Sequence, residues 1–206
     1  MSARQIPIAV LVSGGGTNLQ ALIDAEQAGA LPSGRLALVI SNKPDVYALT
    51  RAQNAGIPCA VVPKAELGQE GMERRMEELL AEYHIGLIVL AGFLSILSPA
   101  FTKKYDRRII NVHPSLLPFF CGAGFYGLRV HEAALAKGVK VTGATVHYVN
   151  EIPDGGEIIL QKAVRVRDND TPQILQKRVM RLAEWKLLPA AAELVSKKLL
   201  RENSNT

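Results

Sequence analysis

Short apolar runs recur along this chain with room for one helix between each run and the next, and this alternation limits the possible fold more than any other feature. Each run has the length of a strand and is apolar at nearly every position, as is typical of strands buried on both faces of a parallel sheet. The runs cover residues 6–12, 35–41, 58–63, 87–91 and 109–113. The pattern predicts an α/β fold with a doubly wound, mostly parallel sheet flanked by helices.

The segments between the runs carry helical signals. Apolar side chains at helical spacing follow Asn18 and predict a first helix there. A second helix is expected over 46–55, where Gly56 ends it, and a third, amphipathic helix is expected over about 71–83.

The last third of the chain predicts a different arrangement. Residues 140–150 read as a strand, and residues 158–166 read as a return strand after a turn, so an antiparallel pair should complete the sheet. Thr171 and Pro172 are a cap and a first-turn proline, which open a final helix.

Three further expectations concern this part of the chain. Leu175, Val179 and Leu182 have the spacing of a buried stripe on the final helix. The segment 119–131 is rich in glycine and aromatic residues and is expected to be a mobile loop over a site. The polar tail 197–206 is expected to be frayed.

Length and charge narrow the class of protein. A chain of 206 residues predicts one α/β domain. The 24 basic and 19 acidic residues give a net charge of +5 but are interspersed, which suits an anionic small molecule better than nucleic acid. With two cysteines, Cys59 and Cys121, and with neither a signal pattern nor an apolar run of membrane-spanning length, we expect a cytoplasmic protein without a disulfide.

A glycine-rich turn follows the first run. Ser13-Gly14-Gly15-Gly16-Thr17-Asn18 lies between the expected strand and helix, where main-chain amides and the start of a helix can bind a phosphate. The dinucleotide fingerprint fails because Leu19 stands at its third glycine, and no Gly-Lys-Ser/Thr of a phosphate-loop NTPase follows. The alternative is a tight turn with Thr17 or Asn18 as helix cap.

A second polar cluster lies where the fifth run ends. Asn111 and His113 are two positions apart, so on a strand they project from the same face. Pro114 favours an extended backbone at His113, which places both side chains at a strand exit, where open α/β sheets bind ligands. The alternative is a histidine that is simply satisfied in the core or at the surface.

The motif at 111–118, Asn-Val-His-Pro-Ser-Leu-Leu-Pro, resembles the signature of the folate-dependent formyltransferases. The likeness runs from about Ile8 to Val195, and it is strongest to the members that act on 5-phosphoribosylglycinamide. It implies a Rossmann-like fold and transfer of a formyl group from 10-formyltetrahydrofolate in purine (IMP) biosynthesis, without a metal. It also implies a phosphate-binding half over about 1–100 and a catalytic and folate-binding half over about 101–196.

The resemblance assigns substrate-binding residues. Gly16, Thr17 and Asn18 match the positions that hold the substrate phosphate, and Gly15 replaces an asparagine that is more common there. Glu184 matches a residue that contacts the ribose hydroxyls, with Arg181 able to assist. From the residues alone, Arg181 and Glu184 would be an ordinary surface ion pair.

The resemblance also assigns a folate pocket. Its matching positions are Leu94, Ser95, Ile96 and Leu97, together with Asn111. Ser95 stands where arginine is common, and a second arginine of some relatives aligns near Gln69. The acidic tail of the folate should therefore be held less strongly or by other residues. Without the resemblance, this loop could simply be packed in the core.

The third catalytic residue implied by the resemblance is Asp154, 41 positions after His113. By composition, Pro153-Asp154-Gly155-Gly156 is an ordinary turn. His147 lies on the strand before it, either supporting Asp154 or packing in the core.

These three residues suit formyl transfer. Asn111 can donate a hydrogen bond to the oxyanion of a tetrahedral intermediate, and His113 can do so as an imidazolium and can transfer a proton. We expect Asp154 to raise the pKa of His113.

Other functions are less consistent with the residues. Initiator-tRNA formylation and formyltetrahydrofolate hydrolysis use the same three residues, but both relatives normally carry an additional domain. A non-catalytic nucleotide-binding protein would leave Asn111, His113 and Asp154 without a role. A thiol mechanism at Cys121 and an RNA-binding module have no supporting motif. The expected partners are therefore small molecules, with neither nucleic acid nor membrane, in a monomer or a homodimer.

Overall fold

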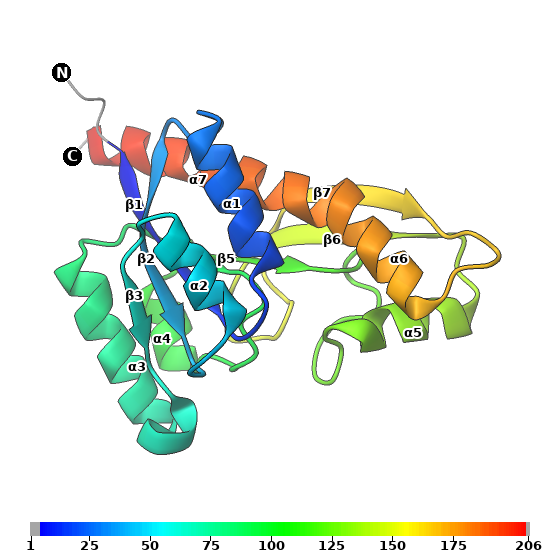
Figure 1. Cartoon of the computed structure of the whole chain (residues 1–206), viewed down its shortest axis with the longest axis horizontal. Helices are drawn as coiled ribbons and strands as arrows, with labels where there is room; N and C mark the ends of the chain where they lie inside the picture. Colours follow the sequence, from blue (N-terminus) through cyan, green and yellow to red (C-terminus); the bar gives the residue numbers. More distant parts are fainter. Residues whose placement is uncertain (1–4, 205–206) are drawn as a thin grey trace.

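A seven-stranded sheet runs through the middle of the protein (Figure 1), seen in a computed structural model that describes residues 5–204. The strand order is β3-β2-β1-β4-β5-β6-β7. The first five strands are parallel to one another, whereas β6 is antiparallel to both β5 and β7. The mostly parallel sheet and its antiparallel C-terminal strand pair are as predicted. The strands are β1 (Ile6–Val12), β2 (Gly34–Ser41), β3 (Cys59–Val61), β4 (Leu87–Leu90), β5 (Ile109–His113), β6 (Val141–Tyr148) and β7 (Ile158–Arg165).

Helices cover both faces of this sheet (Figure 1). Successive side chains of a strand face opposite sides, so Val10 joins a core under α1, α2, α6 and α7, while Leu11 joins a core under α3 and α4. The helices are α1 (Thr17–Gln27), α2 (Tyr47–Asn54), α3 (Lys64–Glu82), α4 (Pro99–Lys104), α5 (Leu128–Lys137), α6 (Pro172–Val179) and α7 (Trp185–Ser204), with a π-helical turn, η1 (Met180–Glu184), between the last two. Within residues 5–204, no helix is both long and apolar enough to cross a membrane.

The sequence analysis missed two helices, α4 and α5. The expectation of an irregular loop over 119–131 was wrong for its last residues, because α5 begins at Leu128. Val130 and Ala134 are fully buried on one side of α5, and Gly138 ends it in a left-handed conformation. The glycines that precede this helix obscured the helical spacing that follows them.

Helix α3 also begins earlier than expected, at Lys64. A short first part ends at Gly68, which has a φ of 70° and breaks the helical backbone. The amphipathic part that follows buries Met72, Met76 and Leu80, as its spacing predicted.

The π-helical turn overturns one packing prediction. The prediction that Leu175, Val179 and Leu182 form one buried stripe assumed a regular α-helix. A π turn contains an extra residue, which rotates the side chains that follow it about the helix axis. Leu175 and Val179 are fully buried, whereas Leu182 is 37% exposed and Ala183 takes the inward position.

The expectation of a frayed tail from Lys197 was wrong up to Ser204, because α7 continues to that residue. Leu199 is buried in the core under β1, and Leu200 packs against the same core. These two apolar side chains hold the end of the helix in place although the residues around them are polar.

Leu199→Ala should therefore destabilise the protein by about 3 kcal/mol, because it removes a buried side chain and leaves a cavity. Leu194→Ala on the same helix is a matched control, since Leu194 is 50% exposed and its loss should change stability by less than about 0.5 kcal/mol. Urea denaturation of both variants measures the difference. Equal effects would mean that the end of α7 is not docked.

Candidate functional site

Three polar side chains meet at the carboxyl ends of the parallel strands. Asn111 and His113 project from β5, and Asp154 comes from the turn between β6 and β7. The distance from His113 Nδ1 to Asp154 Oδ2 is 3.4 Å, and Asn111 Nδ2 lies 3.5 Å from Asp154 Oδ1. The structure thus brings together the three residues that the sequence analysis singled out as catalytic.

The local sequence explains how Asp154 reaches this position. Asp154 has a φ of 55°, a left-handed conformation that aspartate tolerates better than most residues. The turn then passes so close to β6 that a side chain at Gly156 would place its Cβ 1.7 Å from the Tyr148 carbonyl oxygen. The glycine permits this approach, and the turn brings the Asp154 carboxylate against β5.

His147 connects two of these residues. It is paired with Asn111 across β5 and β6, and its Nε2 lies 3.2 Å from Asn111 Nδ2 and 3.5 Å from Asp154 Oδ1. Its Nδ1 lies 2.7 Å from the Tyr148 carbonyl oxygen, which can only accept, so Nδ1 carries a hydrogen. His147 therefore does more than pack in the core, because it orients the Asn111 amide.

Two main-chain groups that sequence reasoning missed complete the cluster. The Phe120 carbonyl oxygen lies 2.9 Å from His113 Nε2, and the Gly122 amide donates to Asp154 Oδ2 over 2.9 Å. Both belong to the loop between β5 and α5. No side-chain pattern predicts such contacts, since any residue can supply a main-chain carbonyl or amide.

Burial and charge act in opposite directions on the catalytic candidates. Burial lowers the pKa of His113 below its ordinary value, although the Asp154 carboxylate and the Phe120 carbonyl favour the charged ring. Asp154 raises the pKa of His113 as expected, but desolvation outweighs this contribution, so the pKa as a whole is lowered. Burial by itself raises the pKa of Asp154, yet His147, His113 and the Gly122 amide together bring that pKa below its ordinary value.

The protonation states follow from these pKa directions. At neutral pH, Asp154 is charged and His113 is mostly neutral. Because the Phe120 carbonyl requires a hydrogen on Nε2, the unprotonated nitrogen of His113 is Nδ1, which faces Asp154. This nitrogen can take a proton, and the adjacent carboxylate stabilises the imidazolium that results.

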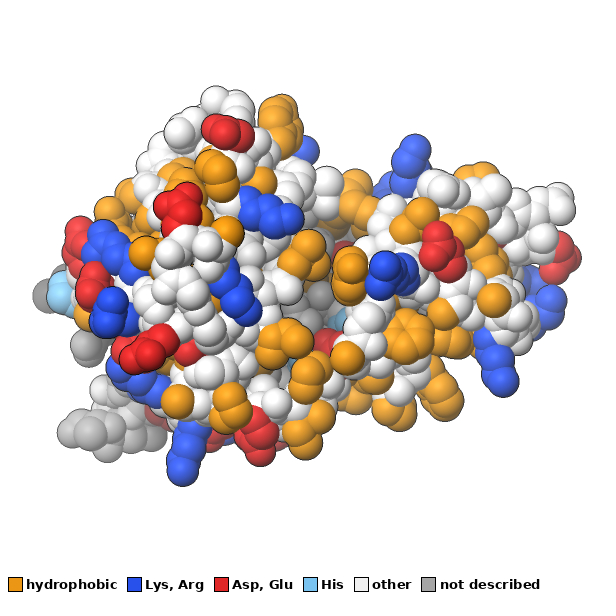
Figure 2. All heavy atoms as spheres, turned by 90° about the horizontal axis from the view of Figure 1, so that it is seen from below, with side chains coloured by type: hydrophobic (Ala, Val, Ile, Leu, Met, Phe, Trp, Pro, Cys, Tyr) orange, Lys and Arg blue, Asp and Glu red, His pale blue; other side chains and the backbone are white. Residues whose placement is uncertain are grey.

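The cluster opens onto a cavity of about 580 Å³. Seen from below (Figure 2), hydrophobic side chains surround a hollow in the middle of this face, with acidic and histidine side chains inside it. Leu94 and Ile96 are more than half exposed at the cavity wall, while Ser95 and Leu97 line an adjoining hollow together with Asn111 and Asp154. The cavity is lined by, among others, Asn18, Leu94, Ile96, Asn111, His113, Asp154 and Glu184.

On another part of the cavity wall, the glycine turn and the π-helical turn are in contact. Asn18 donates to Glu184 over 2.8 Å, although the two are 166 positions apart. Glu184 is buried rather than at the surface, and Arg181 is exposed and makes no ion pair with it among the described residues. Gly16 and Thr17 precede Asn18, and Thr17 lines a neighbouring hollow rather than this cavity.

The loop after β4 is held by polar side chains of α3. Gln69 donates to the Ile96 carbonyl over 3.1 Å, and the Ser98 amide and hydroxyl both donate to Glu73 over 2.6 Å. Ser95 accepts a hydrogen bond of 2.8 Å from Asn42. Gln69 and Ser95, which stand where the resemblance places arginines of relatives, thus make hydrogen bonds within the protein.

His131 is a further residue of the cavity wall that the sequence analysis did not select. It is fully buried, neither ring nitrogen has a hydrogen-bond partner within residues 5–204, and burial lowers its pKa to about 4. His131 lies in the first turn of α5, a helix that the sequence analysis missed. Nothing in the neighbouring sequence indicated a site there.

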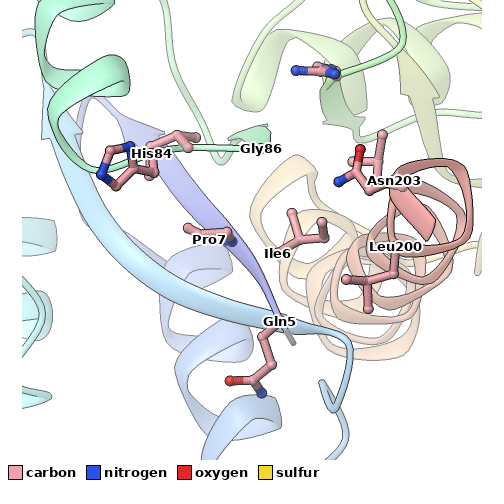
Figure 3. Close-up of a pocket in the computed structure, with 10 residues that line it drawn as sticks. Gln5, Ile6, Pro7, His84, Gly86, Leu200 and Asn203 are labelled. Carbon is pink, nitrogen blue, oxygen red and sulfur yellow. The ribbon is translucent and has the colours of Figure 1, made fainter. Parts of the chain in front are cut away.

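A second hollow, of about 360 Å³, lies at the opposite end of β1 (Figure 3). There Ile6 and Pro7 lie between His84 on one side and Leu200 and Asn203 of α7 on the other. It contains none of the convergent polar groups described above. Within the described residues, no group of three or more His, Cys, Asp or Glu side chains is placed to hold a metal ion.

Comparison with known proteins adds a family match. Residues 6–192 match a family model described as formyl transferase. The chain is 40% identical to phosphoribosylglycinamide formyltransferase of Haemophilus influenzae over 96% of this chain and 91% of the relative. It is 45% identical to the trifunctional purine biosynthetic protein adenosine-3 of Homo sapiens over 92% of this chain, but it spans only 18% of that relative's length.

Solved structures agree with this match. Glycinamide ribonucleotide transformylase 1 from Symbiobacterium toebii superimposes with a TM-score of 0.88 at 38% identity, over 95% of this chain and 90% of the other. The phosphoribosylglycinamide formyltransferase of Coxiella burnetii gives 0.86 at 41% identity, over 95% and 89%.

The burial of Glu184 predicts a pH-dependent stability. Burial raises the pKa of this carboxyl from 4.5 to about 7, despite the hydrogen bond from Asn18. Between these values the folded protein holds a proton that the unfolded chain has lost, so the free energy of unfolding falls as the pH rises through this window. Glu184→Gln keeps an acceptor for Asn18 and cannot ionise.

The stability of Glu184→Gln relative to the unmodified protein should therefore increase by about 3 kcal/mol between about pH 4.5 and about pH 7.5. Urea denaturation of both proteins across this range measures it. A difference that stays constant with pH would contradict the raised pKa.

Proposed function

The chain belongs to the formyl transferase family, and we propose from this that it transfers the formyl group of 10-formyltetrahydrofolate to the amine of 5-phosphoribosylglycinamide, in purine (IMP) biosynthesis. The observation that carries the proposal is the convergence of Asn111, His113 and Asp154 on one wall of a cavity whose other wall holds Asn18 and Glu184. One end of this cavity suits acyl-transfer chemistry and the other suits a ribonucleotide.

Stabilisation of the oxyanion is assigned to Asn111. When the amine attacks the formyl carbon, the carbonyl oxygen becomes negatively charged and needs hydrogen-bond donors that are already in place. The Asn111 amide is held by His147, so it does not have to reorganise as the charge develops. The imidazolium form of His113 is a second donor.

Proton transfer is assigned to His113. The attacking amine must lose a proton, and the departing folate nitrogen must gain one. The unprotonated Nδ1 of His113 accepts the first proton, the Asp154 carboxylate 3.4 Å away stabilises the imidazolium, and the same proton then passes to the leaving nitrogen. The proton count balances, and this chemistry calls for neither a metal nor a covalent intermediate on the enzyme.

The two substrates would approach from different sides. We assign the phosphate to the main-chain amides around Gly16, Thr17 and Asn18, and the ribose hydroxyls to Glu184, with the exposed Arg181 adding positive charge nearby. The flat folate ring would lie against Leu94, Ile96 and Leu97, with Ser95 and Asn111 beside it. It would cover the apolar surface that Leu94 and Ile96 expose.

The remaining assignments follow the same proposal. Residues 1–100 would bind the phosphate and residues 101–196 would carry the catalytic and folate-binding groups, within one domain. Both substrates are small molecules, and we propose a cytoplasmic enzyme, monomeric or homodimeric, without a nucleic-acid partner.

Formyl transfer should be measured with purified protein, 10-formyltetrahydrofolate and 5-phosphoribosylglycinamide, by following the folate spectrum. Removal of a group that stabilises the transition state should cost about 3 kcal/mol, so His113→Ala and Asn111→Ala should each lower kcat by at least about 100-fold. His84→Asn is a control, because His84 is exposed and lies outside the cavity.

Three other results would identify a different function. Formate release without the amine would indicate a hydrolase, and transfer to initiator tRNA in preference to the ribonucleotide would indicate the tRNA-modifying relatives. Folate binding by a folded protein that transfers nothing to any acceptor would indicate a binding protein.

A further inference from the structure

The carbonyl groups of the three glycines in the turn all accept hydrogen bonds from helices α1 and α2. The Gly14 carbonyl accepts from the Ala48 amide at 3.1 Å, and the Gly16 carbonyl accepts from the Gln20 amide at 2.9 Å. The Gly15 carbonyl, between them, accepts from Arg51 Nε at 2.9 Å. Helices α1 and α2 thus fix three consecutive peptide groups, the middle one through a side chain.

The direction of the amides follows from this anchoring. In a trans peptide, the N–H points opposite to the carbonyl of the preceding residue. With the carbonyls of Gly14, Gly15 and Gly16 turned towards the helices, the amides of Gly15, Gly16 and Thr17 point away from them. Within residues 5–204, these three amides have no hydrogen-bond partner, so they form a preset site for an anion.

Helix α2 also packs tightly against the glycine turn at Gly16. Gly16 has a φ of 71°, and a Cβ added there would lie 2.7 Å from the Ala48 Cβ. The helix that carries Arg51 therefore lies directly on the glycine turn, and the arginine contact is part of this packing.

The guanidinium of Arg51 is itself fixed from several sides. Its Nη1 donates to Gln20 Oε1 over 2.8 Å, Gln20 in turn donates to Asp24, and the group stacks 4.8 Å from the Tyr47 ring centre. A planar fork with separate donors can serve Gly15 and Gln20 at once, which the single ammonium of a lysine cannot reproduce.

We propose that Arg51 is a positioning residue for phosphate binding: by holding the Gly15 carbonyl, it keeps the Gly16 amide aimed at the phosphate of the ribonucleotide. The inference rests on the proposed function, since it takes that phosphate as the anion. It assigns no chemical step to Arg51, and the residue should affect binding of the phosphate rather than formyl transfer itself.

Trp185 is a built-in reporter for a test that does not depend on catalysis. It is the sole tryptophan of the chain, and it lines a hollow of about 440 Å³ together with Thr17, Gln20 and Arg51. Its fluorescence should change when an anion binds the adjacent turn. Ribose 5-phosphate is the probe, titrated into the full chain.

Arg51→Met keeps the apolar stem and removes the donors. The Kd for ribose 5-phosphate should rise about tenfold. In the formyl transfer assay, KM for the ribonucleotide should rise by a similar factor while kcat and KM for the folate change less than about twofold. Arg74→Met is the matched control, since Arg74 is exposed on α3 and makes no side-chain contact with the turn.

A comparison with the substrate that lacks its phosphate separates positioning from general damage. The effect of Arg51→Met should disappear with glycinamide riboside, because that molecule offers nothing to the turn. An unchanged Kd for ribose 5-phosphate, or an equal loss with the phosphorylated and unphosphorylated substrates, would overturn the proposal.

Arg51→Lys provides a second variant that keeps the charge, and it remains the test if Arg51→Met does not fold. Its Kd should lie between those of the other two proteins. A Kd equal to that of the unmodified protein would show that charge alone suffices, which would overturn the positioning role. If the unmodified protein binds ribose 5-phosphate through Arg51 but transfers no formyl group, the proposed function fails while the anion site stands.

Discussion

The pairing of β5 with β6 is the interaction on which the candidate site depends. It places His147 opposite Asn111 and Thr145 opposite His113, so the two polar residues of β5 each gain a partner from a strand more than thirty positions away. Thr145 then donates to the Ser115 carbonyl and accepts from the Leu117 amide, which fixes the path of the chain just after His113. A one-residue slip would turn these side chains to the other face of the sheet and separate the cluster.

Main-chain groups supply the remaining hydrogen bonds of the candidate site. The Phe120 carbonyl and the Gly122 amide lie on either side of the His113–Asp154 pair, so one ring nitrogen and one carboxylate oxygen are satisfied without using a side chain. The buried imidazole is kept neutral by desolvation, and the carboxylate beside it is kept charged by its hydrogen bonds. A neutral base beside a charged carboxylate is the arrangement that proton transfer near pH 7 requires.

The substrate side of the cavity is built by a different device. A π-helical turn interrupts the helical packing that Leu175 and Val179 begin, and the rotation that results buries Glu184 against Asn18. The π turn therefore leaves Leu182 partly exposed and brings the Glu184 carboxyl into contact with Asn18 at the end of the glycine turn. π turns often occur at functional sites, where the side chain that they redirect has a task.

The sequence by itself determined the succession of strands and of helices α1 to α3 in the parallel half, because buried strands must be apolar throughout and helices must be amphipathic; it did not determine α4. It also determined that Asn111 and His113 share a face, because side chains alternate along a strand. The partnership with Asp154 came only from resemblance, since a Pro-Asp-Gly-Gly turn looks the same in any hairpin. Only the tertiary structure decided which main-chain groups bind His113, how the π turn directs Glu184, and which side chain holds the Gly15 carbonyl. These contacts join residues far apart in the chain through geometry that local propensity does not encode.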